Sequence, residues 1–205
     1  MFYDDTRVLT IRLHDSGRTL LPGTGWATDN GGPGAVGTSV NVALPAGTSD
    51  NQWLRAFNAV VPPVLEEFDA QFLVSQHGCD SHFEDVMAHL LLSVDGQRAS
   101  YAAIHRLAHR LVGGQWVAVG GGGYEMDVVA RAWAHLVAEA AHHPIDPRAG
   151  IPRPSWVAGS LPPLEDCYRP DLVPSETELA LEHGVGRYVL DSVEGISADE
   201  VATKI

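Results

Sequence analysis

Basic residues, cysteines and long apolar stretches are all scarce in this sequence. Its 205 residues hold 13 lysines and arginines against 26 aspartates and glutamates, a formal net charge of −13. Nucleic-acid binding needs a basic surface, so we expect no such partner. The two cysteines, Cys79 and Cys167, are too few for a disulfide framework, which indicates a reducing, cytoplasmic environment. The N-terminus is polar and no apolar run approaches membrane length, so we expect neither a signal peptide nor a membrane span.

The rest of the composition is that of an ordinary globular α/β protein. Hydrophobic residues make up 45% of the chain and charged residues 19%, and the length suffices for one domain with a core. The acidity favours solubility. An acidic rim would also attract cationic substrates such as lysine-bearing chains or polyamines.

Short β-branched runs alternate with helical patterns over most of the chain, which predicts a parallel sheet flanked by helices. Strand patterns cover residues 8–13, 40–44, 72–74 and 116–119, and helical patterns cover residues 49–68, 86–92, 100–112 and 125–143. Pro62 and Pro63 should kink or divide the first helix. Proline and glycine dominate residues 145–174, and short helical patterns return at 176–181 and 186–205.

Four consecutive glycines, Gly120 to Gly123, follow the last strand pattern and lead directly to Tyr124. A glycine loop at the carboxyl end of a strand is typical of ligand sites in open α/β sheets. The tyrosine hydroxyl can donate a hydrogen bond to a developing oxyanion. A phosphate-binding loop is the alternative, but the run lacks the Lys-Ser/Thr of a P-loop and the spacing of a dinucleotide fingerprint.

A second polar loop follows the strand pattern at 72–74. It carries five side chains suited to chemistry, namely His77, Asp80, His82, Glu84 and Asp85. Because both loops follow strands of one parallel sheet, we expect them to converge on a single site. Considered without any relatives, His77, Asp80 and His82 look like a three-ligand metal set, since zinc accepts histidine and carboxylate ligands.

Several motifs in this order and spacing resemble those of a known family. They are Phe2-Tyr3-Asp4-Asp5, Arg7-Val8-Leu9-Thr10-Ile11, Leu13-His14, Pro22-Gly23-Thr24-Gly25, Gly31-Gly32-Pro33-Gly34, Val40-Asn41-Val42-Ala43-Leu44-Pro45, Gly78-Cys79-Asp80-Ser81-His82, the glycine run with Tyr124, and Ala130-Arg131-Ala132-Trp133. The sequence resembles the zinc-dependent histone deacetylase superfamily, and within it the bacterial acetoin utilization proteins. The resemblance implies an arginase/deacetylase-type α/β fold over residues 1–160. Residues 161–205 would form a proline-containing tail with short helices.

The resemblance also implies roles for individual residues. Asp80 corresponds to a zinc ligand, and Tyr124 to the tyrosine that polarises the carbonyl of an acetylated lysine or another acylated amine. His77 would then serve packing or hydrogen bonding. The substrate tunnel and the surroundings of the metal would include Leu21, His82, Met87, Gly122 and Gly123. A monovalent-cation region, where the family binds K⁺, would include Phe2, Val8, Arg12 and Leu13.

The sequence departs from the family pattern in several places. It shows neither the tandem histidine pair that performs acid–base catalysis nor the Asp-x-His motif that supplies two of three zinc ligands. We therefore expect the carboxyl-terminal part of a deacetylase domain, inactive alone and unable to hold Zn²⁺ tightly. The alternative is a non-catalytic short protein that pairs with a separate first half or another partner. Leu21 replaces a usual phenylalanine. Arg12 replaces a common serine. Either its guanidinium takes the place of the cation, or the substitution reflects drift in a chain no longer selected for catalysis.

The remaining histidines of interest lie on the predicted helices. We expect His105, His109 and His135 to face solvent. His142 and His143 end the last helix, where positive charge is favourable, and lie far from either polar loop.

Overall fold

The structure, a computed structural model, describes residues 1–146. Strands and helices alternate as the sequence predicts. In chain order the elements are β1 (Thr10–Asp15), β2 (Ser39–Leu44), α1 (Asp50–Phe68), β3 (Leu73–His77), α2 (Val94–Val112), β4 (Trp116–Gly120) and α3 (Met126–Ala140). None of these helices combines the length and apolarity needed to cross a membrane. The tail and the short helical patterns predicted beyond residue 146 lie outside the described residues.

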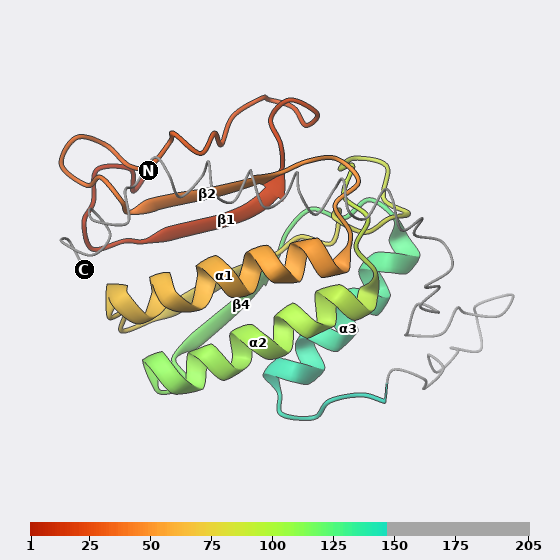
Figure 1. The fold of residues 1–205 in the computed structure, drawn as a ribbon. Helices are drawn as coiled ribbons and strands as arrows, with labels where there is room; N and C mark the ends of the chain where they lie inside the picture. Colours follow the sequence, from red (N-terminus) through yellow and green to blue (C-terminus); the bar gives the residue numbers. More distant parts are fainter. Residues whose placement is uncertain (147–205) are drawn as a thin grey trace, which may run out of the picture.

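The strands form two parallel pairs, β1 with β2 and β3 with β4. Thr10 pairs with Ser39 in the first, and Leu73 pairs with Trp116 in the second. Within residues 1–146 no strand joins the two pairs. The three helices lie side by side along the strands, and α2 contacts both α1 and α3 (Figure 1).

Apolar side chains link the strand pairs to the helices. Val42 and Leu44 of β2 pack against Ala56 and Val60 of α1, and a second cluster of Phe57, Val61 and Leu107 joins α1 to α2. A third cluster, made of Cys79, Val128 and Ala132, fixes α3 beneath the loop after β3.

No element within residues 1–146 covers one face of the β3–β4 pair. Val74, Val117 and Val119 alternate with inward-facing residues and are 61%, 44% and 42% exposed. Parallel sheets normally have both faces covered, so this surface is unusual for its type.

The first helix agrees closely with prediction. It begins at Asp50, after Ser49, whose backbone N–H donates to the Gln52 side-chain oxygen at 3.1 Å, and it ends at Phe68. Pro62 and Pro63 do not divide it, because a single helix spans both.

The predicted helix at 86–92 is wrong. The backbone N–H groups of Leu91 and Leu92 donate instead to the carbonyls of Thr48 and Ser81, at 2.8 and 3.1 Å. The following helix, α2, begins at Val94 rather than at residue 100. Its N-cap is Ser93, whose hydroxyl accepts a hydrogen bond from the Gly96 N–H at 3.1 Å.

Candidate functional site

The two polar loops meet at the carboxyl ends of β3 and β4. These strands are parallel neighbours, so the loops after them emerge at the same edge. The Cys79 N–H donates to the Gly122 carbonyl at 2.7 Å, which fixes one loop against the other. The structure therefore brings Asp80 and the glycine run together.

Close packing explains all four glycines, and a Cβ atom on Gly123 would lie 2.6 Å from Cys79 Sγ. A Cβ atom on Gly122 would lie 2.3 Å from Oδ2 of Asp80, and one on Gly120 would lie 2.9 Å from the Trp133 ring. At Gly121 the atom would overlap the Gln76 side chain. The run thus leaves room for the Asp80 carboxylate between the two loops.

Asp80 is partly buried in this space. Burial is the main cause that raises the pKa of its carboxyl group, and the charge of Asp85 adds to it against the lowering effect of a backbone hydrogen bond. A carboxylate in this setting is a hard oxygen ligand that a cation would stabilise.

Asp85 holds the chain at Tyr124. Its Oδ2 atom accepts hydrogen bonds from the N–H groups of Tyr124 and Glu125, at 2.7 and 3.2 Å, while its Oδ1 atom accepts one from the Met87 N–H. Asp85 is 8% exposed, whereas Tyr124 is 56% exposed. The main chain at the tyrosine is therefore fixed while its ring points outward. Sequence reasoning placed Asp85 in the loop but assigned it no role, since no pattern predicts two amide donors from a distant segment.

His77 and His82 are buried and engaged away from Asp80. His77 Nε2 lies 2.7 Å from Ser75 Oγ, and its ring meets Tyr101 edge-on at 4.9 Å. Burial lowers the pKa of His77 to about 4. These contacts match the packing and hydrogen bonding expected of His77.

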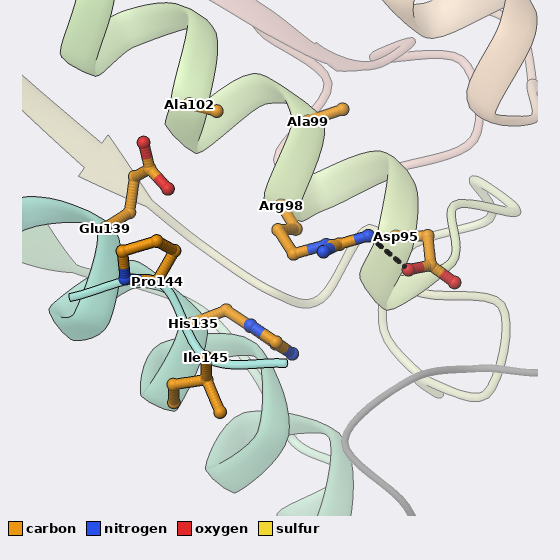
Figure 2. Close-up of a pocket in the computed structure, with 8 residues that line it drawn as sticks. All are labelled: Asp95, Arg98, Ala99, Ala102, His135, Glu139, Pro144 and Ile145. Carbon is orange, nitrogen blue, oxygen red and sulfur yellow. Dashed lines mark hydrogen bonds and ion pairs between the residues drawn. The ribbon is translucent and has the colours of Figure 1, made fainter. Parts of the chain in front are cut away.

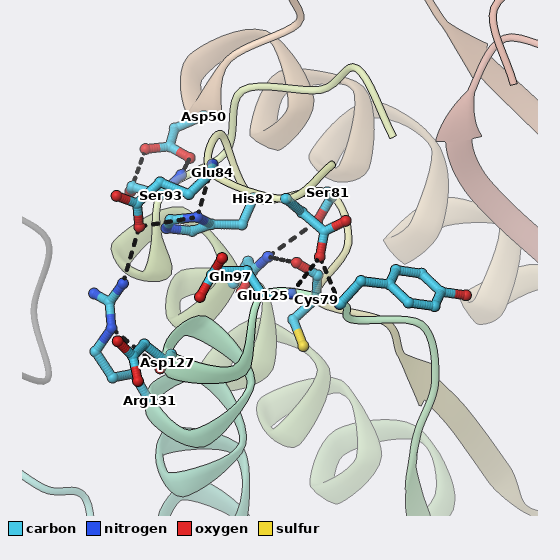
Figure 3. A network of polar contacts seen from close by, with 12 residues as sticks. Asp50, Cys79, Ser81, His82, Glu84, Ser93, Gln97, Glu125, Asp127 and Arg131 are labelled. Carbon is cyan, nitrogen blue, oxygen red and sulfur yellow. Dashed lines mark hydrogen bonds and ion pairs between the residues drawn. The ribbon is translucent and has the colours of Figure 1, made fainter. Parts of the chain in front are cut away.

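His82 belongs to a polar network behind the loop. Its Nδ1 accepts a hydrogen bond from the Glu84 N–H at 3.1 Å, and Arg131 donates to Glu84 Oε2 at 3.5 Å (Figure 3). Gln97 of α2 donates to the Cys79 carbonyl and to Ser81 Oγ, at 3.3 and 3.0 Å. The network anchors the loop that carries Asp80.

Residues 1–146 do not gather three metal ligands at Asp80. The group of three ligand atoms found within these residues lies elsewhere, so His77, Asp80 and His82 do not form the three-ligand set that the loop suggested. Catalytic zinc normally takes three protein ligands. Asp80 fits as one of them, and the described residues do not complete the set.

Two other predicted site residues, Leu21 and Arg12, share a pocket that is separate from Asp80 and Tyr124. Leu21 is 91% exposed and lines, with Arg12, a pocket of about 630 Å³ beside β1 and β2 whose lining does not include Asp80 or Tyr124. Arg12 Nη1 lies 3.5 Å from both Ser39 Oγ and Asn41 Oδ1. Five further positions complete the account: Met87 and Phe2 are exposed, Gly123 has a positive φ of 154°, and Val8 and Leu13 are partly buried.

Comparison with known proteins identifies the family. Residues 1–140 match the histone deacetylase domain. The chain belongs to the histone deacetylase family. It is 39% identical over 157 residues to the acetoin utilization protein AcuC of Bacillus subtilis, covering 76% of this chain and 40% of that protein. The AcuC protein of Staphylococcus aureus (strain MRSA252) is 34% identical over 145 residues, 70% of this chain and 37% of its own length. The chain thus spans about 40% of these relatives.

Solved structures of this family confirm the predicted fold. A histone deacetylase homolog from Aquifex aeolicus superposes with a TM-score of 0.69 at 25% identity, over 90% of this chain and 52% of that one. The histone deacetylase Clr3 gives a TM-score of 0.64 at 26% identity, over 93% of this chain and 29% of that one. The fold is therefore the deacetylase type, of which these residues form a part.

Proposed function

We propose that this chain supplies part of a zinc-dependent deacetylase site, with Asp80 as a metal ligand and Tyr124 as the donor to the substrate carbonyl. The observation that carries this proposal is the meeting of two strand-end loops, which sets Asp80 in the gap left by Gly122. The same junction fixes the main chain of Tyr124 through Asp85. Membership of the histone deacetylase family supports both roles.

The reaction would be the hydrolysis of an acylated amine, such as acetyl-lysine, to a carboxylate and a free amine. When bound, Zn²⁺ supplies a Lewis acid and lowers the pKa of a water molecule. Tyr124 would donate its hydroxyl hydrogen to the carbonyl oxygen, where negative charge develops in the transition state. Its ring is exposed and its backbone is fixed, so the hydroxyl can reach a substrate without distortion of the loop.

The base that activates water would come from outside the described residues. His77 is buried and bonded to Ser75, and its lowered pKa makes it a poor proton acceptor. His82 is fully buried within the polar network. We therefore propose that the acid–base histidines and the other zinc ligands belong to a first half of the domain, carried by a longer form or by a separate chain. Buried, free Cys79 supports a reducing, cytoplasmic location.

The open face of the β3–β4 pair supports such a pairing. Val74, Val117 and Val119 form an apolar surface next to unpaired strand edges within residues 1–146. A second layer of the same domain would cover it. The alternative function is a non-catalytic protein that binds a partner through this face. It is supported by the fact that the described residues provide Asp80 but do not complete a set of zinc ligands.

Completion of the domain tests these proposals. The part of B. subtilis AcuC that lies outside its matched segment would be fused to, or coexpressed with, this chain. We expect no hydrolysis of acetyl-lysine peptides by this chain alone and zinc-dependent hydrolysis by the completed protein. Chelator-sensitive turnover by the isolated chain would contradict the proposed origin of the missing ligands. A completed protein that folds and binds zinc without turnover would favour the non-catalytic alternative.

The variant Tyr124→Phe tests the donor in the completed protein. It removes only the hydroxyl group, so kcat should fall by roughly 10²–10³-fold, the usual cost of one oxyanion donor. Tyr3→Phe is the matched control, because Tyr3 is also exposed but lines the pocket beside β1 and β2, which does not include Tyr124. A kcat for Tyr124→Phe within a few-fold of the parent value would exclude the proposed role.

A further inference from the structure

Three histidines gather at the end of β4 opposite the glycine loop. His105 and His109 lie one turn apart on α2, and His142 follows the end of α3. One ring nitrogen from each lies within 4.8 Å of the other two. The Nε2 atoms of His105 and His109 are 3.0 Å apart, and the His142 ring centre lies 4.5 Å from that of His105. The sequence predicted that His105 and His109 face solvent and that His142 lies far from the polar loops. It did not predict that the three histidines lie together.

A carboxylate and an aromatic ring orient His105. Its Nδ1 lies 3.1 Å from Glu139 Oε1, and its ring stacks on Trp116 with centres 5.5 Å apart. Glu139 belongs to α3 and lines a small pocket between α2 and α3 (Figure 2). When Nδ1–H donates to this carboxylate, the Nε2 lone pair points towards His109. A carboxylate behind a histidine in this manner is the usual outer partner of a metal ligand.

The backbone at the end of α3 brings the third histidine into the cluster. His142 has a φ of 59°, a left-handed conformation that few non-glycine residues adopt. Its N–H donates to the Glu139 carbonyl at 3.1 Å. The His142 ring thereby lies over α2, with its centre 5.1 Å from that of His109.

We propose that His105, His109 and His142 bind one Zn²⁺ ion, which ties α2 to the end of α3. Neutral imidazole is a favoured zinc ligand, with Zn–N bonds of about 2.0–2.1 Å, so tetrahedral ligands lie about 3.4 Å apart. The cluster reaches that spacing through rotation of the two exposed rings, His109 and His142. A water molecule would take the fourth position.

This site is separate from the proposed catalytic one. His105 stacks on Trp116, which is the first residue of β4. The glycine loop begins at Gly120, which is the last residue of this strand. At about 3.3 Å per residue, the strand separates these two ends by about 13 Å. The proposal does not depend on deacetylation.

Metal titration of the full chain, purified without a histidine tag and stripped of metal, tests the proposal. We expect one equivalent of Zn²⁺ by calorimetry and a tetrahedral Co²⁺ spectrum in the visible range. His109→Gln should weaken Zn²⁺ binding at least tenfold, and so should His142→Asn, in which asparagine tolerates the left-handed backbone. Glu139→Gln should weaken it by about 10–100-fold while the three ligands remain.

Two variants act as controls. His143→Gln removes the adjacent histidine, which is not in the cluster, and Asp80→Asn removes the proposed catalytic ligand; both should bind Zn²⁺ like the parent. Zinc should also raise the Tm of the parent but not that of His142→Asn. Absence of stoichiometric binding by the folded parent would overturn the proposal. So would binding that survives combined His109→Gln and His142→Asn substitution, or binding that Asp80→Asn abolishes.

Discussion

Replacement of Gly122 with alanine should displace the Asp80 carboxylate. The new Cβ atom would lie 2.3 Å from Asp80 Oδ2, whereas ordinary contact begins near 3.4 Å, so the carboxylate must move by about 1.1 Å. The backbone cannot retreat freely, because the Gly122 carbonyl accepts the Cys79 N–H at 2.7 Å. Overpacking of this kind costs about 1–3 kcal/mol of unfolding free energy. In the completed enzyme, a ligand shift of about 1 Å should lower the rate by roughly 100-fold.

A double-mutant cycle isolates this contact. The three nearest atoms to the new Cβ all belong to the Asp80 carboxyl group, so Asp80→Ala should relieve the clash. Urea unfolding of both single variants and the double variant should give a coupling energy of about 1–3 kcal/mol. Gly34→Ala is the control, since no atom lies within 4 Å of its new Cβ. Additive effects of the two substitutions, within about 0.5 kcal/mol, would refute the reasoning.

Two further predictions concern groups around the site. Asp85→Ala removes the shared acceptor of the Tyr124 and Glu125 N–H groups, so the unfolding free energy should fall by about 2 kcal/mol or more, and both amides should lose protection from hydrogen exchange; unchanged protection would contradict this. The folded-state pKa of His77 is lowered to about 4 against 6.5 for the free side chain, so the unfolded chain binds a proton first as pH falls. The free energy of unfolding should therefore decrease between pH 6.5 and 4 by up to about 3 kcal/mol. In His77→Gln, the urea midpoint should depend less on pH over this range. Parallel pH profiles of the parent and the variant would exclude His77 as the cause.

The sequence was sufficient where local patterns decide the structure. The bounds of α1 follow from its apolar spacing and from Ser49 before it, and β2 and β4 follow from their β-branched runs. The convergence of the Asp80 loop and the glycine run also followed, because the carboxyl ends of parallel neighbours share one edge.

Sequence patterns failed where distant segments decide. Residues 86–92 have a helical pattern, but hydrogen bonds from Leu91 to Thr48 and from Leu92 to Ser81 hold the end of the segment in parallel bridges. His135 was expected in solvent and is 3% exposed, because the packing of α3 against α2 covers that side of the helix. The spacing of His105 and His109 is visible in the sequence, yet the third histidine joins them only through the pairing of two helices.

The helix layer also determines how cooperatively the molecule folds. Each strand pair has its own hydrogen-bond ladder, and within residues 1–146 two apolar clusters bridge the two halves. One consists of Phe57, Val61 and Leu107, and the other packs Leu90 and Leu92 against β2 and α1. Loss of both bridges would separate a β1–β2–α1 unit from a β3–α2–β4–α3 unit, and the second unit would keep the cluster of Cys79, Val128 and Ala132. The loops that carry Asp80 and Tyr124 both belong to the second unit. Their mutual geometry therefore survives any partial opening confined to the first.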